Sequence, residues 1–217
     1  MSTRAPSDDG AAPHGRRREP QQDRSRARLE RVVEATTELL VELDPEEVTT
    51  AAIAERANVS VAWIYRYFDN RQAIFDSIVL DAVHRQFEQT QAALLTAAEG
   101  DWRKGVRAVL EANVEFFVQE PAFARLWGSE FRSSTMLAAN QMHDDDQAQW
   151  IYDTMSERGL LCTGPAAQRA CRLVVALSDR GLELAFAYDL SADRTIVQQL
   201  GDALIALLEP FVTDRAS

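Results

Sequence analysis

Residues 49–71 read TTAAIAERANVSVAWIYRYFDNR, a stretch that predicts two short helices joined by a tight turn. Thr49 or Thr50 can cap the first helix, because a threonine hydroxyl accepts a hydrogen bond from the free backbone N–H groups at a helix start. Asn58 falls in the turn, where the backbone needs a residue that tolerates left-handed dihedral angles. Ser60 is a natural N-cap for the second helix. The stretch therefore predicts a helix-turn-helix unit.

The second helix of this unit carries more aromatic and basic surface than folding requires. Ile64 and Phe68 lie four residues apart and are expected to point inward. The other faces carry Val61, Ala62, Trp63, Tyr65, Arg66 and Tyr67. Asn70 can cap the next helix, so that Arg71 lies in its first turn, where backbone N–H groups and an arginine suit a DNA phosphate. We therefore expect the second helix to lie in the major groove of DNA; the alternative is an ordinary helical hairpin with packed aromatic side chains.

Two segments of the unit carry a family resemblance. Residues 53–60 read IAERANVS and residues 64–68 read IYRYF, a pair that resembles the signature of the TetR family of one-component bacterial transcription regulators. The resemblance covers roughly residues 26–85. Beyond them it is architectural, an all-helical C-terminal half of suitable length with the stretch ALSDRGL at residues 176–182. It implies a DNA-binding regulator and argues against an enzyme.

The resemblance also implies which residues contact DNA. Phosphate contacts would fall on Thr49, Tyr67 and Arg71. Base-facing contacts would fall on Val61, Ala62, Trp63, Tyr65 and Arg66, with Ser60 at the start of their helix. The chain departs from the family pattern at Asn58, where glycine is usual, at Asp44-Pro45, where a glycine-aromatic pair is usual, and at Trp63, where a small residue is usual. The operator sequence is therefore not transferable from relatives.

The charge distribution bears on DNA binding. The net charge of −11 argues against indiscriminate binding of nucleic acids. Residues 1–28 weaken that objection, because they hold seven arginines against four acidic residues. Residues 46–71 hold three arginines against four acidic residues, a weak electrostatic footprint for DNA. Specific docking would then depend on local arginine placement, helix ends and the N-terminal arm; the alternative is a helical protein-interaction module whose head does not read DNA.

Periodicity and composition divide the chain into three parts within an all-α fold of about nine helices. Residues 1–25 are rich in arginine and poor in apolar side chains, so we expect a disordered arm that follows DNA phosphates or, alternatively, an inert tail. Residues 26–71 form a helix-turn-helix domain, and residues 72–217 a helical ligand-binding and dimerisation domain. Outside the helix-turn-helix, helices are expected at residues 26–43, 71–94, 101–118, 121–128, 136–158 and 165–188, and from a cap at Ser191 to Pro210.

The last two helices predict a homodimer. The helix at 165–188 is apolar nearly all round, and the final helix has two apolar faces. A four-helix contact between two chains would bury both, whereas the alternative is a larger monomeric core. The expected interface residues are Leu173, Leu177, Leu182, Leu200, Leu204, Leu207 and Leu208.

The middle helices predict a small-molecule site. They are rich in large aromatic residues with a few polar groups among them, which is typical of an apolar cavity that binds a ligand. The expected lining residues are Phe87, Asn113, Phe117, Trp127 and Trp150. The implied effector is a small apolar or aromatic molecule.

Other kinds of site are not predicted. His143 begins a run with three aspartates, but consecutive helical residues diverge by roughly 100°, so we expect a solvated acidic helix start and no metal site. Cys162 and Cys171 match no disulfide framework or zinc pattern and are expected to be small buried residues in a reducing cytoplasm. No apolar run approaches the ~20 residues needed to span a bilayer. The sequence contains no nucleophile elbow or phosphate-binding glycine loop, so neither a catalytic residue nor a cofactor is predicted.

Together these features predict a homodimeric regulator that acts as a repressor. It would bind a palindromic operator in double-stranded DNA and release it when an effector binds the body. We expect it in the cytoplasm, associated with the nucleoid.

Overall fold

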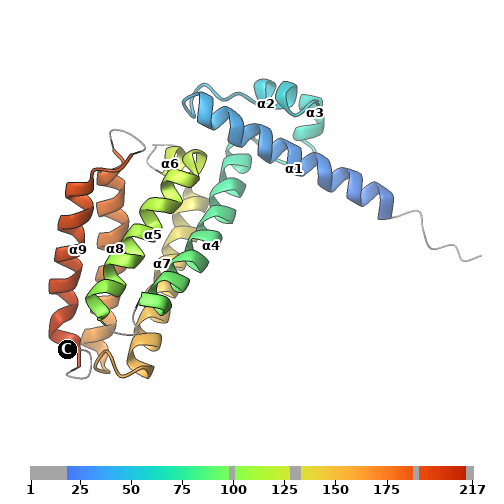
Figure 1. The fold of residues 1–217 in the computed structure, drawn as a ribbon. Helices are drawn as coiled ribbons and strands as arrows, with labels where there is room; N and C mark the ends of the chain where they lie inside the picture. Colours follow the sequence, from blue (N-terminus) through green and yellow to red (C-terminus); the bar gives the residue numbers. More distant parts are fainter. Residues whose placement is uncertain (1–18, 98–100, 128–132, 188–190, 214–217) are drawn as a thin grey trace, which may run out of the picture.

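The computed structural model describes residues 19–97, 101–127, 133–187 and 191–213, and in these ranges the chain forms nine α-helices. A small head made of α1–α3 lies at one end of a body of long, roughly aligned helices, and α4 runs from the head into the body (Figure 1). The elements are α1 (Glu19–Glu42), α2 (Thr50–Arg56), α3 (Val61–Ile64), α4 (Arg71–Ala97), α5 (Trp102–Gln119), α6 (Pro121–Trp127), α7 (Ser134–Glu157), α8 (Pro165–Ala185), α9 (Arg194–Leu208) and the 3-10 turn η1 (Glu209–Phe211).

The first helix begins earlier than the sequence predicts. α1 starts at Glu19, so residues 19–25 of the expected arm are helical. Proline is tolerated in the first turn, where Pro20 lies, and the segment then continues with good helix formers. Arg26 and Glu30, one turn apart, form an ion pair at 3.1 Å that further supports this end of α1. Residues 1–18 of the expected arm lie outside the described residues.

The head has the predicted helix-turn-helix. The Thr49 hydroxyl accepts a hydrogen bond from the N–H of Ala52, and the Ser60 hydroxyl accepts one from the N–H of Trp63, both at 3.1 Å. Asn58 has a φ of 53°, the left-handed conformation that the turn was expected to need. α3 is shorter than expected: it ends at Ile64, and residues 65–67 continue as a turn in which the Tyr67 N–H bonds to the Ile64 carbonyl.

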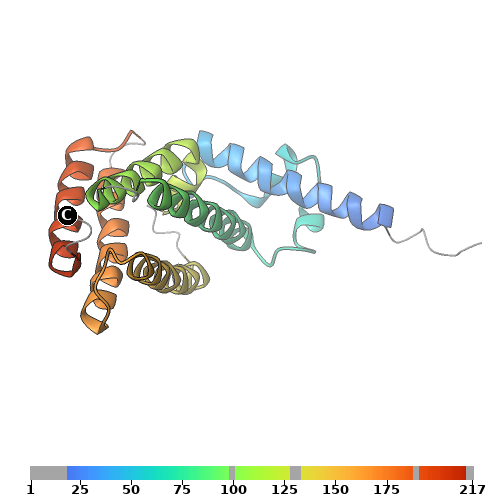
Figure 2. The same cartoon turned by 60° about the horizontal axis from the view of Figure 1, so that its bottom comes forward.

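Five long helices build the body. In two views, α4 and α5 lie side by side, with α7 beside α4 and with α8 and α9 paired at the far edge (Figures 1 and 2). A Cβ at Gly181 of α8 would lie 2.6 Å from the Leu200 side chain of α9, so glycine permits this close packing. Two helix starts differ from expectation. α7 begins at Ser134, and α9 is capped by Asp193 instead of Ser191, because the Asp193 carboxylate accepts hydrogen bonds from the next turn.

The buried residues form two clusters. The first joins the head to the upper body: it contains Ile53 and Ile64 of the head together with Phe116, Phe123 and Leu126 of α5 and α6. The second lies among α5, α7, α8, α9 and the end of α4. Packing is therefore continuous across the expected boundary at residues 71 and 72.

The two cysteines differ in exposure. Cys171 is buried in the body, as expected, but Cys162 is exposed. Cys162 follows the buried Leu161 in an extended segment, and successive side chains of an extended segment point to opposite sides. Among the described helices, none is both long and apolar enough to cross a membrane.

Candidate nucleic-acid interface and ligand cavity

The outer surface of the head carries exposed aromatic and basic side chains. Tyr65 is 53% exposed, and Val61 and Tyr67 are also among the exposed large apolar residues. Ala62 and Arg66 are exposed beside them. Most of the residues expected to contact bases therefore face solvent and are available to a partner.

Trp63 differs from its neighbours on α3. Its ring lies 4.6 Å from the ring of Tyr67, and its side chain is half-buried against the head core. This tryptophan thus has a packing role in the free protein. It supports Tyr67, one of the residues expected to contact a phosphate.

Arg71 holds the segment between α1 and α2. Its guanidinium donates hydrogen bonds to the carbonyl oxygens of Glu46 at 3.0 Å and Val48 at 2.6 Å, and lies 5.3 Å from the ring centre of Phe75. The expected phosphate-binding residues Thr49 and Arg71 are thus both tied to the local fold. Sequence reasoning found Arg71 but not these carbonyl partners, which lie 23 and 25 residues away.

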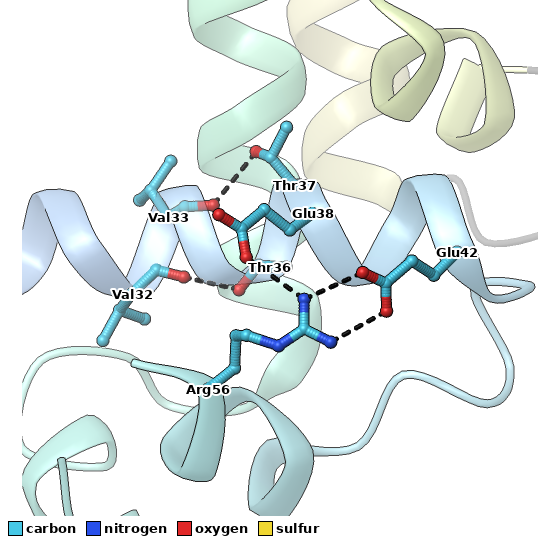
Figure 3. Close-up of polar contacts among 7 residues, drawn as sticks. All are labelled: Val32, Val33, Thr36, Thr37, Glu38, Glu42 and Arg56. Carbon is cyan, nitrogen blue, oxygen red and sulfur yellow. Dashed lines mark hydrogen bonds and ion pairs between the residues drawn. The ribbon is translucent and has the colours of Figure 1, made fainter. Parts of the chain in front are cut away.

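An ion-pair clamp fastens α2 to α1 (Figure 3). Arg56 Nη1 and Nη2 contact the two carboxylate oxygens of Glu42 at 3.0 and 2.8 Å, and Nη1 also contacts Glu38 at 3.1 Å. The hydrogen bonds lower the pKa of Glu42 and raise that of Arg56. A two-pronged arginine-carboxylate contact sets orientation as well as distance. The clamp therefore helps to set the angle between α1 and the helix-turn-helix, although the sequence hinted at it only through two glutamates one turn apart.

We expect Arg56→Ala to loosen the head. Without the guanidinium, α2 loses its polar tie to α1, so amide hydrogen exchange in residues 50–64 should accelerate while exchange in α8 stays unchanged. The exchange rate in Arg56→Lys should lie between those of wild type and Arg56→Ala, because lysine keeps the charge but lacks the planar guanidinium group. Mass spectrometry of exchanged peptides measures this. Equal exchange in wild-type protein and Arg56→Ala would show that the clamp is dispensable.

Two adjoining cavities lie in the body. An apolar cavity of about 60 Å³ is lined by residues of α4, α5, α7, α8 and α9, among them Trp102 and Val106, and by Leu160 of the segment between α7 and α8. A more polar cavity of about 40 Å³ is lined by α4, α5, α7 and α8 together with Trp127 of α6. Val109, Ile151, Val174 and Ser178 line both cavities, so the two share a wall.

The structure divides the expected ligand residues into two groups. Asn113 and Trp127 line the polar cavity. Phe87, Phe117 and Trp150 line neither of these cavities, because their rings are used in packing: Phe87 meets Trp150 edge-on at 6.1 Å, and Phe117 stacks on Phe186 at 5.0 Å. Of the five expected lining residues, therefore, only Asn113 and Trp127 border one of these two cavities.

Two residues that the sequence analysis did not expect at a ligand site line the polar cavity. His143 and Asp144 line it, and both lie in the middle of α7 instead of at a solvated helix start. Burial lowers the pKa of His143 and raises that of Asp144 to about 7, with the charges of Asp179 and Asp145 adding to the latter shift. Asn113 is almost fully buried; its amide oxygen accepts from Gln86 at 2.6 Å and its nitrogen donates to the Val109 carbonyl at 2.8 Å.

The residues expected at the dimer interface differ in how exposed they are in the single chain. Leu173 and Leu177 on α8 are 52% and 45% exposed, and Leu200 and Leu207 on α9 are half-buried. In contrast, Leu182, Leu204 and Leu208 are buried in the core of a single chain, which corrects the expectation that they meet a partner. Their helix faces turn toward the body, a direction that apolar periodicity alone does not reveal.

The sequence matches models of two known protein families. Residues 32–78 match the family model of bacterial regulatory proteins of the tetR family, and residues 100–212 match that of the tetracyclin repressor-like C-terminal domain, which spans more than half of the chain. The chain belongs to the TetR family. It is thus a helix-turn-helix transcription regulator, from a family of regulators that bind DNA operators and small effectors and are not enzymes.

Individual relatives of this TetR-family protein are distant. It is 29% identical over 147 residues to the uncharacterized HTH-type transcriptional regulator YvkB of Bacillus subtilis, covering 64% of this chain and 74% of YvkB. Among solved structures, SmeT, the repressor of the Stenotrophomonas maltophilia multidrug efflux pump SmeDEF, aligns with a TM-score of 0.66 at 19% identity, over 89% of this chain and 94% of SmeT. RolR in complex with resorcinol aligns with a TM-score of 0.64 at 14% identity, over 86% of this chain and 90% of RolR. At these identities the structures share the fold.

We expect the stability of this TetR-family regulator to depend on Asp144. The folded pKa of about 7 lies above the ordinary aspartate value, so the folded state binds the proton more tightly than the unfolded state. The stability that Asp144 contributes is therefore present at about pH 4 and is lost as the pH rises through 7. Asp144→Asn should lose less stability than wild type as the pH rises from about 4 to about 7, and it should be the more stable protein above about pH 7. Urea unfolding at several pH values measures this; parallel pH profiles for the two proteins would contradict it.

Proposed function

We propose that this regulator is a homodimeric, ligand-responsive repressor that binds an inverted-repeat operator. The observation that carries the proposal is the exposed row of Val61, Tyr65, Arg66 and Tyr67 on a capped α3 and the turn after it, at the outer end of the molecule (Figure 1). A folded head does not require such a surface, whereas a helix that enters the major groove does. The arginine clamp and the Ser60 cap hold this surface in position.

DNA recognition would combine positioning contacts with base contacts. Thr49, Tyr67 and the N–H groups at the helix starts would contact phosphates, and Arg71 would add charge beside them. Arg66 is suited to a guanine edge, while Tyr65 and the exposed Val61 suit apolar contacts such as a thymine methyl. The arginines of the N-terminal arm would add sequence-independent affinity.

Dimerisation would use the outer face of α8 and α9. Leu173, Leu177 and Leu184 are exposed on α8, next to the half-buried Leu200 and Leu207 of α9. A second copy of the chain covering this face would remove these leucines from water. Two-fold symmetry would then present two heads to two half-sites, which explains the choice of an inverted repeat.

The effector would act through α6. Trp127 of α6 lines the polar cavity and also belongs to the buried cluster shared with the head. Arg125 of the same helix pairs with Asp44, in the loop after α1, at 3.2 Å. A ligand that moves Trp127 would therefore shift the head. To release DNA, the ligand needs only to bind more tightly to the dimer whose two heads are not spaced to fit the operator. The complex of RolR with resorcinol supports a small effector in a protein of this fold.

Selection of bound duplexes from a random DNA pool by the purified full chain, followed by sequencing, tests the proposal. An enriched palindrome supports an operator-binding dimer and supplies a probe for effector screening. No enrichment at low salt would contradict it and would favour a protein-interaction module whose head does not read DNA. We expect a protein with this role to act in the cytoplasm, at the nucleoid.

A further inference from the structure

The two cavities of the body adjoin each other, and one is mainly apolar while the other is more polar. The apolar cavity of about 60 Å³ and the polar cavity of about 40 Å³ share Val109, Ile151, Val174 and Ser178. The far wall of the apolar part is made of side chains such as Trp102 and Leu160. A ligand that spans both parts must therefore be amphipathic.

The described wall of the polar cavity, which forms the polar end of the proposed site, carries carboxyl side chains. Asp144 lines it, and no arginine or lysine is found among the described residues of its wall. Within the described ranges, no ion pair involves Asp144, and its carboxylate accepts a hydrogen bond of 3.3 Å from the neutral amide of Asn140. Asn140 therefore supplies N–H but no compensating charge. A half-buried carboxylate in this setting attracts a cation more strongly than an exposed one, because water screens it less.

Other walls of the polar end are compatible with a cation. The Asn113 amide is already paired with Gln86 and with the Val109 carbonyl, so it shapes the wall without adding charge. Trp127 contributes an aromatic side chain, which attracts a cation lying over its face. Burial lowers the pKa of His143, which favours its neutral form beside the carboxylate.

We propose that the effector is an amphipathic amine whose protonated nitrogen binds the Asp144 carboxylate while its apolar part fills the adjoining cavity. The inference rests on the proposed function, in which these cavities hold the effector. The effector proposed here is cationic, whereas the sequence analysis implied a purely apolar or aromatic one. The same charge would reject carboxylate ligands, since two like charges would meet at the polar end.

Binding of such a cation should be coupled to proton release. Burial raises the pKa of Asp144 to about 7, and a bound ammonium would lower it again by favouring the ionised form. Amine affinity should therefore rise between about pH 5.5 and about pH 8. Among the residues that the structure describes, the titratable and charged groups around Asp144 are His143, Asp145 and Asp146 on α7, Arg172 and Asp179 on α8 and His84 on α4.

A matched series of three probes tests the charge preference. They are 4-phenylbutylamine, 4-phenylbutan-1-ol and 5-phenylvalerate, which share one phenylbutyl group and differ in their head group. Calorimetric titration into the full chain without DNA, at about pH 8, should give an affinity for the amine about tenfold or more above that for the alcohol, with the carboxylate weakest. An amine that binds no better than the alcohol, or no detectable amine binding, overturns the proposal.

Asp144→Asn assigns the preference to one residue. It should bring amine affinity down to that of the alcohol and abolish the rise with pH. Asp153→Asn, an isosteric change of equal charge at an exposed position of α7, should leave both unchanged. A preference that survives in Asp144→Asn overturns the assignment. Operator binding is measured separately on the same proteins. A protein that binds the operator but does not prefer the amine contradicts this inference alone. A protein that prefers the amine but selects no operator contradicts the proposed function alone.

Discussion

Replacing Tyr65 and Arg66 together by alanine is expected to weaken specific operator binding by about 100-fold or more. Both side chains are exposed at the end of α3, where the helix would meet the major groove. A side chain that reads a base edge contributes about 1–3 kcal/mol, and contributions from separate base pairs are roughly additive. Fluorescence anisotropy with the selected operator at one fixed salt concentration measures the loss.

The fold and the dimer should survive this double change. Neither side chain belongs to the head core, and Arg66 makes no described ion pair, its nearest aromatic contact being the Tyr67 ring at 6.0 Å. Arg158→Ala, which removes the same charge from an exposed position at the end of α7, is the matched control and should bind the operator normally. Undiminished binding by the double variant would mean that Tyr65 and Arg66, in the turn after α3, do not read bases.

Placing glutamates at both Leu173 and Leu177 is expected to dissociate the dimer and thereby to remove operator binding. The two leucines are 52% and 45% exposed in the single chain, so the substitutions should not disturb its core. In a dimer they would bury unpaired charges, at a cost of about 3–5 kcal/mol for such a charge, and the symmetry repeats each one. The dimer dissociation constant should rise by about 1000-fold or more.

Sedimentation velocity measures the oligomeric state of this variant. Leu137→Glu provides the control, because Leu137 is 51% exposed on α7, a helix outside the expected α8–α9 interface. It should remain dimeric and bind DNA. A double variant that sediments as a dimer would place the interface elsewhere on the molecule.

Local patterns in the sequence were sufficient for the head. The sequence predicts a cap at Thr49 or Thr50, a cap at Ser60, a left-handed Asn58 and an inward Ile64, and the structure has all four, with Thr49 as the first cap. Each depends on interactions within three or four residues, or on the dihedral preference of a single residue. The predicted start of α1 was wrong, because the composition of residues 19–25 indicated disorder, whereas their helix propensity is high enough for them to extend the helix.

The all-α class, the helix-turn-helix and the family resemblance could be predicted from the chain alone, because caps, turns and helical periodicity are properties of short segments. The burial of particular leucines, the contact of Arg56 between α2 and α1, and the position of Asp144 of α7 at a cavity could not. These features depend on how each helix is rotated against neighbours that are distant in the chain. A sequence shows that a helix has an apolar face, but packing decides whether that face meets its own core, a second chain or a ligand.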